Sequence, residues 1–231
     1  MKTVGLLGGM SWESTAPYYR TINRLVGERL GGLHSAKIAL YSVDFHEIEE
    51  FQHAGRWSEA GAILVAAARG LQRAGADFLV LCTNTMHKVA PQLEAAVDIP
   101  LLHIADATAT RIKTAGLGRL GLLGTRFTME EEFYRGRLED RHGLEILVPA
   151  AEQRATVHRI IYDELCRGSV LEESRAVYQQ IVSGLIHQGA EGVILGCTEI
   201  GLLLRPQDAD APLFDTAEIH AEEAARYALA T

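Results

Sequence analysis

The 231-residue chain repeats the same landmarks, in the same order, in its two halves. An apolar run followed by glycine at Val4–Gly8 recurs 116 residues later at Leu120–Gly124. The stretch GADFLVLCT, which ends at Thr83, recurs as GAEGVILGCT, which ends at Thr198. Self-similarity at a nearly fixed offset indicates that one supersecondary unit is used twice. The repeat therefore predicts that the two halves of the chain have similar folds.

Each half alternates short apolar runs with longer amphipathic segments. Phe78–Leu81 is a continuous apolar run bounded by polar residues, which is typical of a buried parallel strand. Residues 58–74 carry apolar side chains at helical spacing and lead into that strand. The pattern predicts an α/β protein with two similar Rossmann-like domains, each with a parallel sheet, related by a pseudo-twofold, and an active site in the cleft between them.

Proline-led strands mark the end of each half. Pro100-Leu101-Leu102 closes the first half and Pro212-Leu213-Phe214 closes the second. We expect the first domain to comprise residues 1–103 with the C-terminal helix 217–231, and the second domain to comprise residues 104–216.

Composition excludes several classes of protein. A net charge of −8 and a pI near 5.6 argue against a nucleic-acid partner, which normally selects a basic face. The apolar stretches are too short for a membrane span, and the N-terminus lacks the apolar core of a secretory signal. Three cysteines, an odd number, fit free thiols in a reducing cytoplasm. We expect a cytoplasmic protein that acts on a small molecule.

Cys82 and Cys197 each follow a predicted strand and precede a threonine. Ligands of open α/β sheets bind beyond the carboxyl ends of the strands, where these thiols would lie. A thiolate and a thiol on opposite faces of a tetrahedral carbon can remove a proton from one side and return one to the other. The matched pair therefore predicts racemisation or epimerisation with two bases. Cys166 has no counterpart in the repeat, and we interpret it as structural.

Motifs for cofactors and metals are not recognised. Neither His-Glu-x-x-His nor Cys-x-x-Cys occurs, so no metal is expected. Gly8-Gly9 fits neither a P-loop nor the dinucleotide fingerprint. This pair forms either a tight turn or a nest of N–H groups that holds a carboxylate, and we favour the second interpretation.

The segments GLLGGMSWEST, CTNTMHK and GCTEI resemble the cofactor-independent aspartate/glutamate racemase family, in particular its broad-specificity amino-acid racemase branch. The resemblance extends along nearly the whole chain and implies two α/β domains, no pyridoxal phosphate and a homodimer. It implies that Cys82 and Cys197 are the catalytic cysteines. The substrate-binding residues that it implies, together with the hydrogen-bonding residues beside the cysteines, are Met10, Ser11, Gln52, Thr83, Asn84, Thr85, Thr125, Thr198 and Glu199.

The nominal substrate is aspartate or glutamate, but the sequence departs from strict aspartate racemases. Where those enzymes resemble one another in carrying basic residues, this chain has Glu47 and Glu164. A carboxylate in the side-chain pocket would favour neutral or cationic side chains, unless Arg159 or Arg167 supplies positive charge. Two alternatives remain: a related cysteine-dependent isomerase or decarboxylase, and a non-catalytic amino-acid or carboxylate-binding protein.

Overall fold

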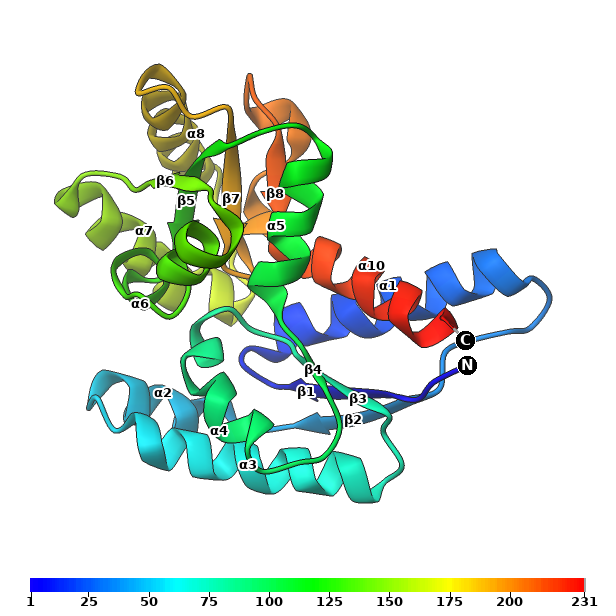
Figure 1. Ribbon diagram of the computed structural model, residues 1–231. Helices are drawn as coiled ribbons and strands as arrows, with labels where there is room; N and C mark the ends of the chain where they lie inside the picture. The colour runs from blue at the N-terminus through cyan, green and yellow to red at the C-terminus, as the bar shows by residue number, and fades with distance from the viewer. Residues whose placement is uncertain (231) are drawn as a thin grey trace. The chain divides into compact units, whose positions relative to one another are not determined.

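The computed structural model describes residues 1–230 and divides into two compact units. The first unit comprises Met1–His103 and the segment that begins at His220, and the second comprises Ile104–Ile219. Each unit is built on one four-stranded parallel sheet (Figure 1). The predicted α/β class with two parallel sheets is confirmed.

The two sheets have the same topology. The first consists of β1 (Val4–Gly8), β2 (Ile38–Ser42), β3 (Phe78–Leu81) and β4 (Leu101–Leu102), in the order β2-β1-β3-β4. The second consists of β5 (Arg119–Gly124), β6 (Glu145–Leu147), β7 (Gly192–Gly196) and β8 (Leu213–Asp215), in the order β6-β5-β7-β8. The internal repeat of the sequence is therefore a repeat of sheet topology.

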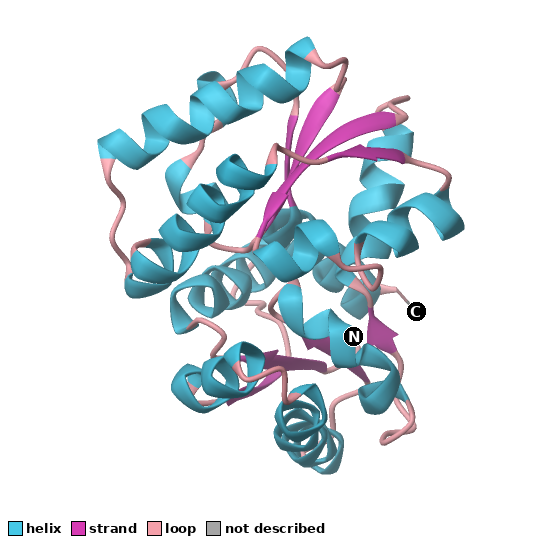
Figure 2. Cartoon of the chain, turned by 90° about the vertical axis from the view of Figure 1, so that its left-hand side faces the viewer, coloured by secondary structure: helices cyan, strands magenta, loops and turns pink. Residues whose placement is uncertain are grey.

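Helices cover both faces of the first sheet (Figure 2). The helices of this unit are α1 (Trp12–Leu30), α2 (Phe45–His53), α3 (Trp57–Arg73), η1 (Thr85–Val89), α4 (Ala90–Glu94) and the greater part of α10 (Thr216–Leu229). Leu64 of α3 is buried in one cluster with Leu7 and Leu79 of the sheet. On the opposite face, the Phe78 ring packs against Tyr227 of α10, with centroids 4.7 Å apart. Burial on both faces explains the continuous apolar strands.

The second unit has one hydrophobic core around its sheet. Its helices are α5 (Ile104–Thr114), α6 (Arg126–Glu130), η2 (Arg137–Arg141), α7 (Ala151–Asp163), η3 (Leu165–Arg167), α8 (Glu172–His187), α9 (Ile200–Leu203) and η4 (Pro206–Asp208). Asp106 of α5 accepts from Arg137 at 2.6 Å and lies 2.8 Å from His142 Nε2, which fixes α5 to η2.

Several helices differ from the sequence pattern. The sequence of residues 128–141 favours one helix after the strand, but that helix is interrupted, because Glu131 is extended and α6 ends at Glu130. The sequence near residues 87–96 also favours a helix, but the structure has a 3₁₀ turn followed by a short α-helix. Pro91 lies in the first turn of this helix and disfavours helical geometry at the residue before it. Conversely, the polar segment after Asp44 is helical from Phe45, since the Asp44 carboxylate accepts from the His46 N–H at 3.0 Å.

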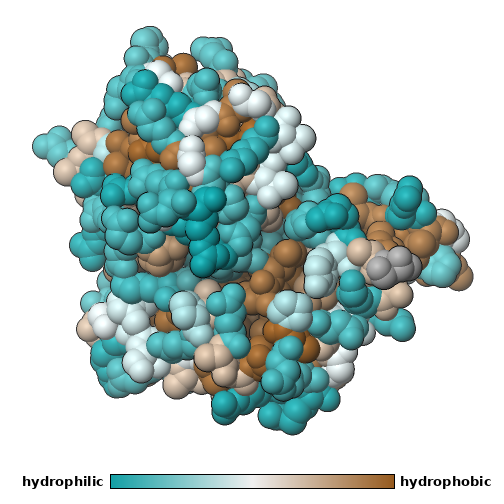
Figure 3. All heavy atoms as spheres, in the orientation of Figure 1, coloured by the Kyte–Doolittle hydropathy of each residue, from teal (hydrophilic) through white to brown (hydrophobic). Residues whose placement is uncertain are grey.

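The visible surface is largely hydrophilic, with a hydrophobic area over the ends of α1 and α10 (Figure 3). A depression of about 520 Å³ in this area is lined by Leu25, Arg29, Glu222, Ala225, Arg226, Leu229 and Ala230. Across residues 1–230, the helices lack the combination of length and hydropathy that would let one cross a membrane.

Candidate active site

Cys82 follows β3 directly and continues its ladder. The Cys82 N–H donates to the Leu7 carbonyl at 2.9 Å, so the thiol is carried at the carboxyl end of the sheet. The side chain is fully buried, and its Sγ donates to the Val80 carbonyl at 3.6 Å. Burial raises the pKa of the Cys82 thiol well above its usual range, because a thiolate is poorly solvated there.

A buried polar turn follows Cys82. Thr83, Asn84 and Thr85 are all buried, and the Thr83 N–H turns back to the Leu81 carbonyl at 2.9 Å. The His87 Nδ1 lies 2.7 Å from the Thr83 carbonyl, and because a carbonyl only accepts, Nδ1 carries the proton. His87 therefore holds the turn that presents the three polar side chains.

The loop after β1 is a tight turn. Gly9 has a φ of +95°, and a Cβ there would overlap the Val43 backbone. Its N–H donates to Thr15 Oγ1 at 2.9 Å, and that hydroxyl donates to the Ser11 carbonyl at 2.8 Å. The Gly9 N–H thus has an internal acceptor, which favours the tight-turn interpretation at this amide. The turn buries the side chains of Met10 and Ser11.

Gln52 reaches the same region from α2. Its side chain is buried, and Nε2 donates to the Met86 sulfur at 3.1 Å. Met86 belongs to η1, which follows the turn after Cys82. The bond therefore links α2 to η1, close to the Cys82 thiol in the chain.

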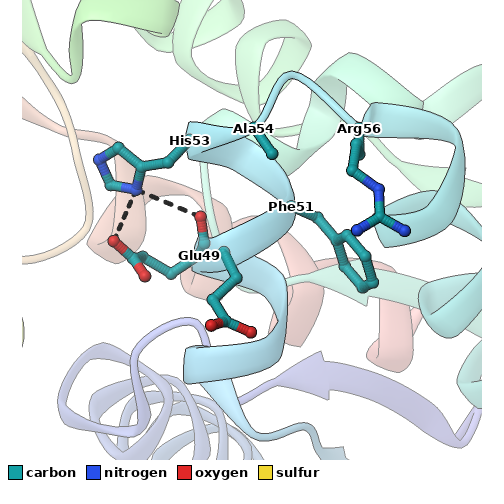
Figure 4. A pocket seen from close by; sticks show the side chains of 6 residues that line it. Glu49, Phe51, His53, Ala54 and Arg56 are labelled. Carbon is teal, nitrogen blue, oxygen red and sulfur yellow. Dashed lines mark hydrogen bonds and ion pairs between the residues drawn. The ribbon is translucent and has the colours of Figure 1, made fainter.

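A separate depression of about 510 Å³ lies at the end of α2 (Figure 4). Glu49, Phe51, His53, Ala54 and Arg56 line it together with Glu50. Its charged side chains have partners. His53 Nδ1 lies 2.6 Å from Glu49 Oε1, and Arg56 lies over the Phe51 ring and bonds to Glu59, which is outside the lining. The predicted site residues are not among its lining residues, so we assign no role to it.

The second half-site follows β7. The Cys197 Sγ donates to Glu199 Oε2 at 2.9 Å, and Thr198 Oγ1 donates to the same oxygen at 2.9 Å. All three side chains are buried. Burial raises the pKa of the Cys197 thiol well above its usual range, and the Glu199 carboxylate raises it further. At rest, Cys197 is therefore a thiol bonded to a carboxylate.

Side chains from three other elements surround Glu199. Cys166 of η3 hydrogen-bonds to its carboxylate, and burial raises the pKa of the Cys166 thiol. Burial also raises the pKa of Tyr178 of α8, whose hydroxyl donates to the Val157 carbonyl at 3.2 Å. Asp215, at the end of β8, accepts from the Ala217 N–H at 2.9 Å, and burial raises its pKa to about 6.

Thr125 occupies the carboxyl end of β5. It is the N-cap of α6, and its Oγ1 accepts the Thr128 N–H at 3.3 Å. Within each unit, the structure brings the predicted residues together as buried side chains at or beside the carboxyl edge of the sheet. In the first unit these are Met10, Ser11, Gln52, Cys82, Thr83, Asn84 and Thr85, and in the second they are Thr125, Cys197, Thr198 and Glu199.

The two acidic residues singled out from the sequence, Glu47 and Glu164, differ in environment. Glu47 is exposed on α2. Glu164 is partly buried, accepts from Ser174 Oγ at 2.5 Å and pairs with Arg159 at 3.3 Å. The positive charge of Arg159 is therefore engaged by Glu164 itself.

Sequence reasoning missed Cys166 as a partner of Glu199. It lies in the 3₁₀ turn η3, and its contact with the Glu199 carboxylate is what distinguishes it. Over residues 1–230, the structure places no three His, Cys, Asp or Glu side chains where they could hold a metal ion.

The chain matches one family along nearly its whole length. The model of the Asp/Glu/hydantoin racemase family matches residues 7–224. The broad-specificity amino-acid racemase RacX of Bacillus subtilis is 24% identical over 218 residues, which cover 92% of each protein.

Solved structures agree with this match. A Yersinia pestis protein whose crystal structure was assigned to the Asp/Glu racemases is 59% identical, with full coverage of both chains and a TM-score of 0.92. An aspartate racemase homologue of Pyrococcus horikoshii is 36% identical, with 99% of each chain covered and a TM-score of 0.84. The chain belongs to the Asp/Glu/hydantoin racemase family.

Proposed function

We propose that this protein racemises amino acids without pyridoxal phosphate, with Cys82 and Cys197 as opposed base and acid at the α-carbon. One observation carries the proposal. The two cysteines occupy repeat-related positions, each directly after the third strand in chain order of a sheet with the same topology. Equivalent thiols suit substrates that are mirror images, because each direction needs a base on one face and an acid on the other. The proposal requires that both half-sites contact the same substrate molecule.

Burial has two opposite effects on such a thiol. It makes the thiolate harder to form, as the raised pKa values of Cys82 and Cys197 indicate. It also makes a thiolate, once formed, a stronger base, because the higher pKa favours capture of a proton. A desolvated thiolate is thus suited to the weakly acidic α-hydrogen of an amino acid, provided that only one of the two thiols is ionised at a time.

We further propose that the buried polar residues of the half-sites hold the substrate. Their hydroxyl and amide groups can bond to the substrate's carboxylate without a fixed cationic side chain. The proposed contacts are Met10, Ser11, Gln52, Thr83, Asn84 and Thr85 from the first unit and Thr125, Thr198 and Glu199 from the second.

The charges near the second half-site bear on the side chain of the substrate. Aspartate and glutamate are the nominal substrates of the family, whereas RacX is described as having broad specificity. Glu164 and its partner Arg159 form a close ion pair, so this pair supplies no net positive charge to a side-chain pocket. This pairing supports acceptance of neutral side chains.

The test is incubation of single amino-acid enantiomers in D₂O without added cofactor, followed by chiral chromatography with mass detection. We expect the opposite enantiomer to appear with deuterium at the α-carbon. Glu173→Gln, at an exposed position of the second unit, serves as the control for Cys82→Ser and Cys197→Ser. Binding without α-proton exchange, or loss of carbon dioxide instead of inversion, would contradict the proposal.

We also propose that the protein forms a homodimer through the hydrophobic area at the ends of α1 and α10. Leu30, at the end of α1, is 45% exposed, and Leu25 and Leu229 line the depression beside it. A second copy would cover these side chains and remove them from water. Analytical ultracentrifugation should show a dimer that Leu30→Glu weakens, while the control Leu202→Glu, at an exposed leucine of the second unit, leaves it unchanged. A monomer in the unmodified protein would contradict the proposal.

A further inference from the structure

We propose that Glu199 is a positioning residue that takes up the proton of Cys197, so that the two half-sites carry out proton transfer differently. This inference rests on the racemase function proposed above. It assigns Glu199 a role that acts through the thiol, in addition to any contact with substrate.

The geometry around Glu199 is that of a proton acceptor. Its Oε2 receives hydrogen bonds from Cys197 Sγ and Thr198 Oγ1, both at 2.9 Å, and only 2% of the residue is exposed. The thiol and the hydroxyl both donate to this one buried oxygen. The Cys197 proton therefore lies on a direct hydrogen-bonded path to an oxygen that can accept it.

The first half-site has no carboxylate at the position that corresponds to Glu199. Cys82-Thr83-Asn84 corresponds to Cys197-Thr198-Glu199, so an amide stands where the second unit has a carboxylate. An amide does not take up a proton near neutral pH. The Cys82 thiol donates instead to the Val80 carbonyl at 3.6 Å, another group that cannot hold the proton. Within residues 1–230, the Cys197 thiol donates to a carboxyl group, whereas the Cys82 thiol donates to a backbone carbonyl.

The proposed step is a coupled pair of proton transfers. As the substrate's Cα–H bond breaks, its proton forms a new S–H bond at Cys197, and the proton already on that sulfur moves to Glu199 Oε2. The negative charge of the carboxylate passes to the α-carbon. Cys82 then donates its proton to the opposite face and becomes the thiolate, which leaves Cys197 and Glu199 both protonated. The reverse direction begins from that state.

Titratable groups that face this pair come from three elements. They are Cys166 of η3, Tyr178 of α8 and Asp215 of β8, with Glu164 and its partner Arg159 near Tyr178. Burial keeps Cys166 and Tyr178 protonated, and Asp215, with a pKa of about 6, is ionised above neutral pH. The surroundings of the pair therefore keep one charge state between about pH 7 and pH 9.

The test compares the pH dependence of kcat/KM in the wild type and Glu199→Gln. We expect the wild type to be flat from pH 7 to pH 9, because the carboxylate takes up the thiol proton. In Glu199→Gln, kcat/KM at pH 7.5 should fall by about 100-fold and should recover by about tenfold for each unit that the pH is raised. The reason is that the Cys197 thiol must now release its proton to water. Glu199→Asp keeps a carboxylate and should keep the flat profile. Glu173→Gln, an exposed charge removal in the same unit, should behave as wild type.

A second readout does not depend on catalysis. The rate of Cys197 alkylation by iodoacetamide, followed by peptide mass spectrometry, should reach its midpoint at lower pH in Glu199→Gln, because a neighbouring anion has been removed. If the wild type racemises no amino acid, the proposed function fails, while this midpoint still tests the Glu199 assignment. An unchanged midpoint, or a wild-type to Glu199→Gln activity ratio that is constant with pH, would overturn the assignment.

Discussion

His220 gives the first unit a stability that depends on pH. Its side chain is fully buried at the start of the α10 segment that packs on the first sheet. Nε2 lies 2.8 Å from the Leu102 carbonyl and therefore donates, while Nδ1 accepts from the Tyr18 hydroxyl at 3.0 Å. Both bonds are satisfied by the neutral ring, and burial lowers the pKa of His220 to about 4.

The sign and size of the effect follow from that pKa. The unfolded chain has a histidine pKa of about 6.5, so it binds the proton more tightly than the folded state, and acid favours unfolding. The stability contributed by the neutral ring is complete above about pH 7 and is lost as the pH falls from 6.5 toward 4. At pH 5 the expected loss is about 2 kcal/mol, since one pKa unit corresponds to about 1.4 kcal/mol.

The assay is urea unfolding of the wild type and His220→Gln at pH 7.5 and pH 5, monitored by far-UV circular dichroism. We expect His220→Gln to be less stable at pH 7.5, because it breaks a buried hydrogen-bonded contact. Its further loss between pH 7.5 and pH 5 should be about 2 kcal/mol smaller than that of the wild type. Direct titration of the ring by NMR supplies the control. Equal pH-dependent losses in the two proteins, or a His220 pKa near 6.5, would refute the reasoning.

The remaining predictions concern the two half-sites. Cys82→Ser and Cys197→Ser should each lower racemisation by at least 10²-fold while the circular dichroism spectrum stays unchanged, because an alcohol is a far weaker base than a thiolate; full activity in either variant would contradict the two-base mechanism. Gly9→Ala should lower stability by about 1–3 kcal/mol in urea unfolding, because the φ of +95° and the Val43 backbone both exclude a side chain there. An unchanged unfolding midpoint would show that the turn adapts.

Sequence patterns predict the part of the fold that depends on local order. Phe78–Leu81 and Gly192–Gly196 are strands because short apolar runs buried on both faces of a parallel sheet cannot alternate with polar residues. The same runs place Cys82 and Cys197 at the strand ends, since each follows its strand without a gap. Candidate catalytic residues were therefore accessible from the sequence, although their functional assignment stays a proposal.

The rest depends on contacts between distant segments. The nine histidines show no spacing pattern, yet the His87 and His103 rings lie 4.3 Å apart and His220 packs against His87 at 6.1 Å. This cluster forms only because α10 returns to the first sheet, which no local periodicity indicates. Cys166 is likewise an ordinary cysteine until η3 folds against Glu199.

The two units show how an internally repeated fold can serve a reaction between mirror images without being symmetric itself. Free enantiomers have equal energies in water, so kcat/KM must be the same in both directions for the wild type and for every variant. The second unit has a carboxylate, Glu199, two residues after its cysteine, and the first unit has an amide, Asn84, at the equivalent position. This difference leaves the kcat/KM values of the two directions equal. It can change which protonation state of the free protein predominates. Under the proposed mechanism, the difference between Glu199 and Asn84 therefore lets kcat and KM each differ between the two enantiomers, while kcat/KM stays the same for both.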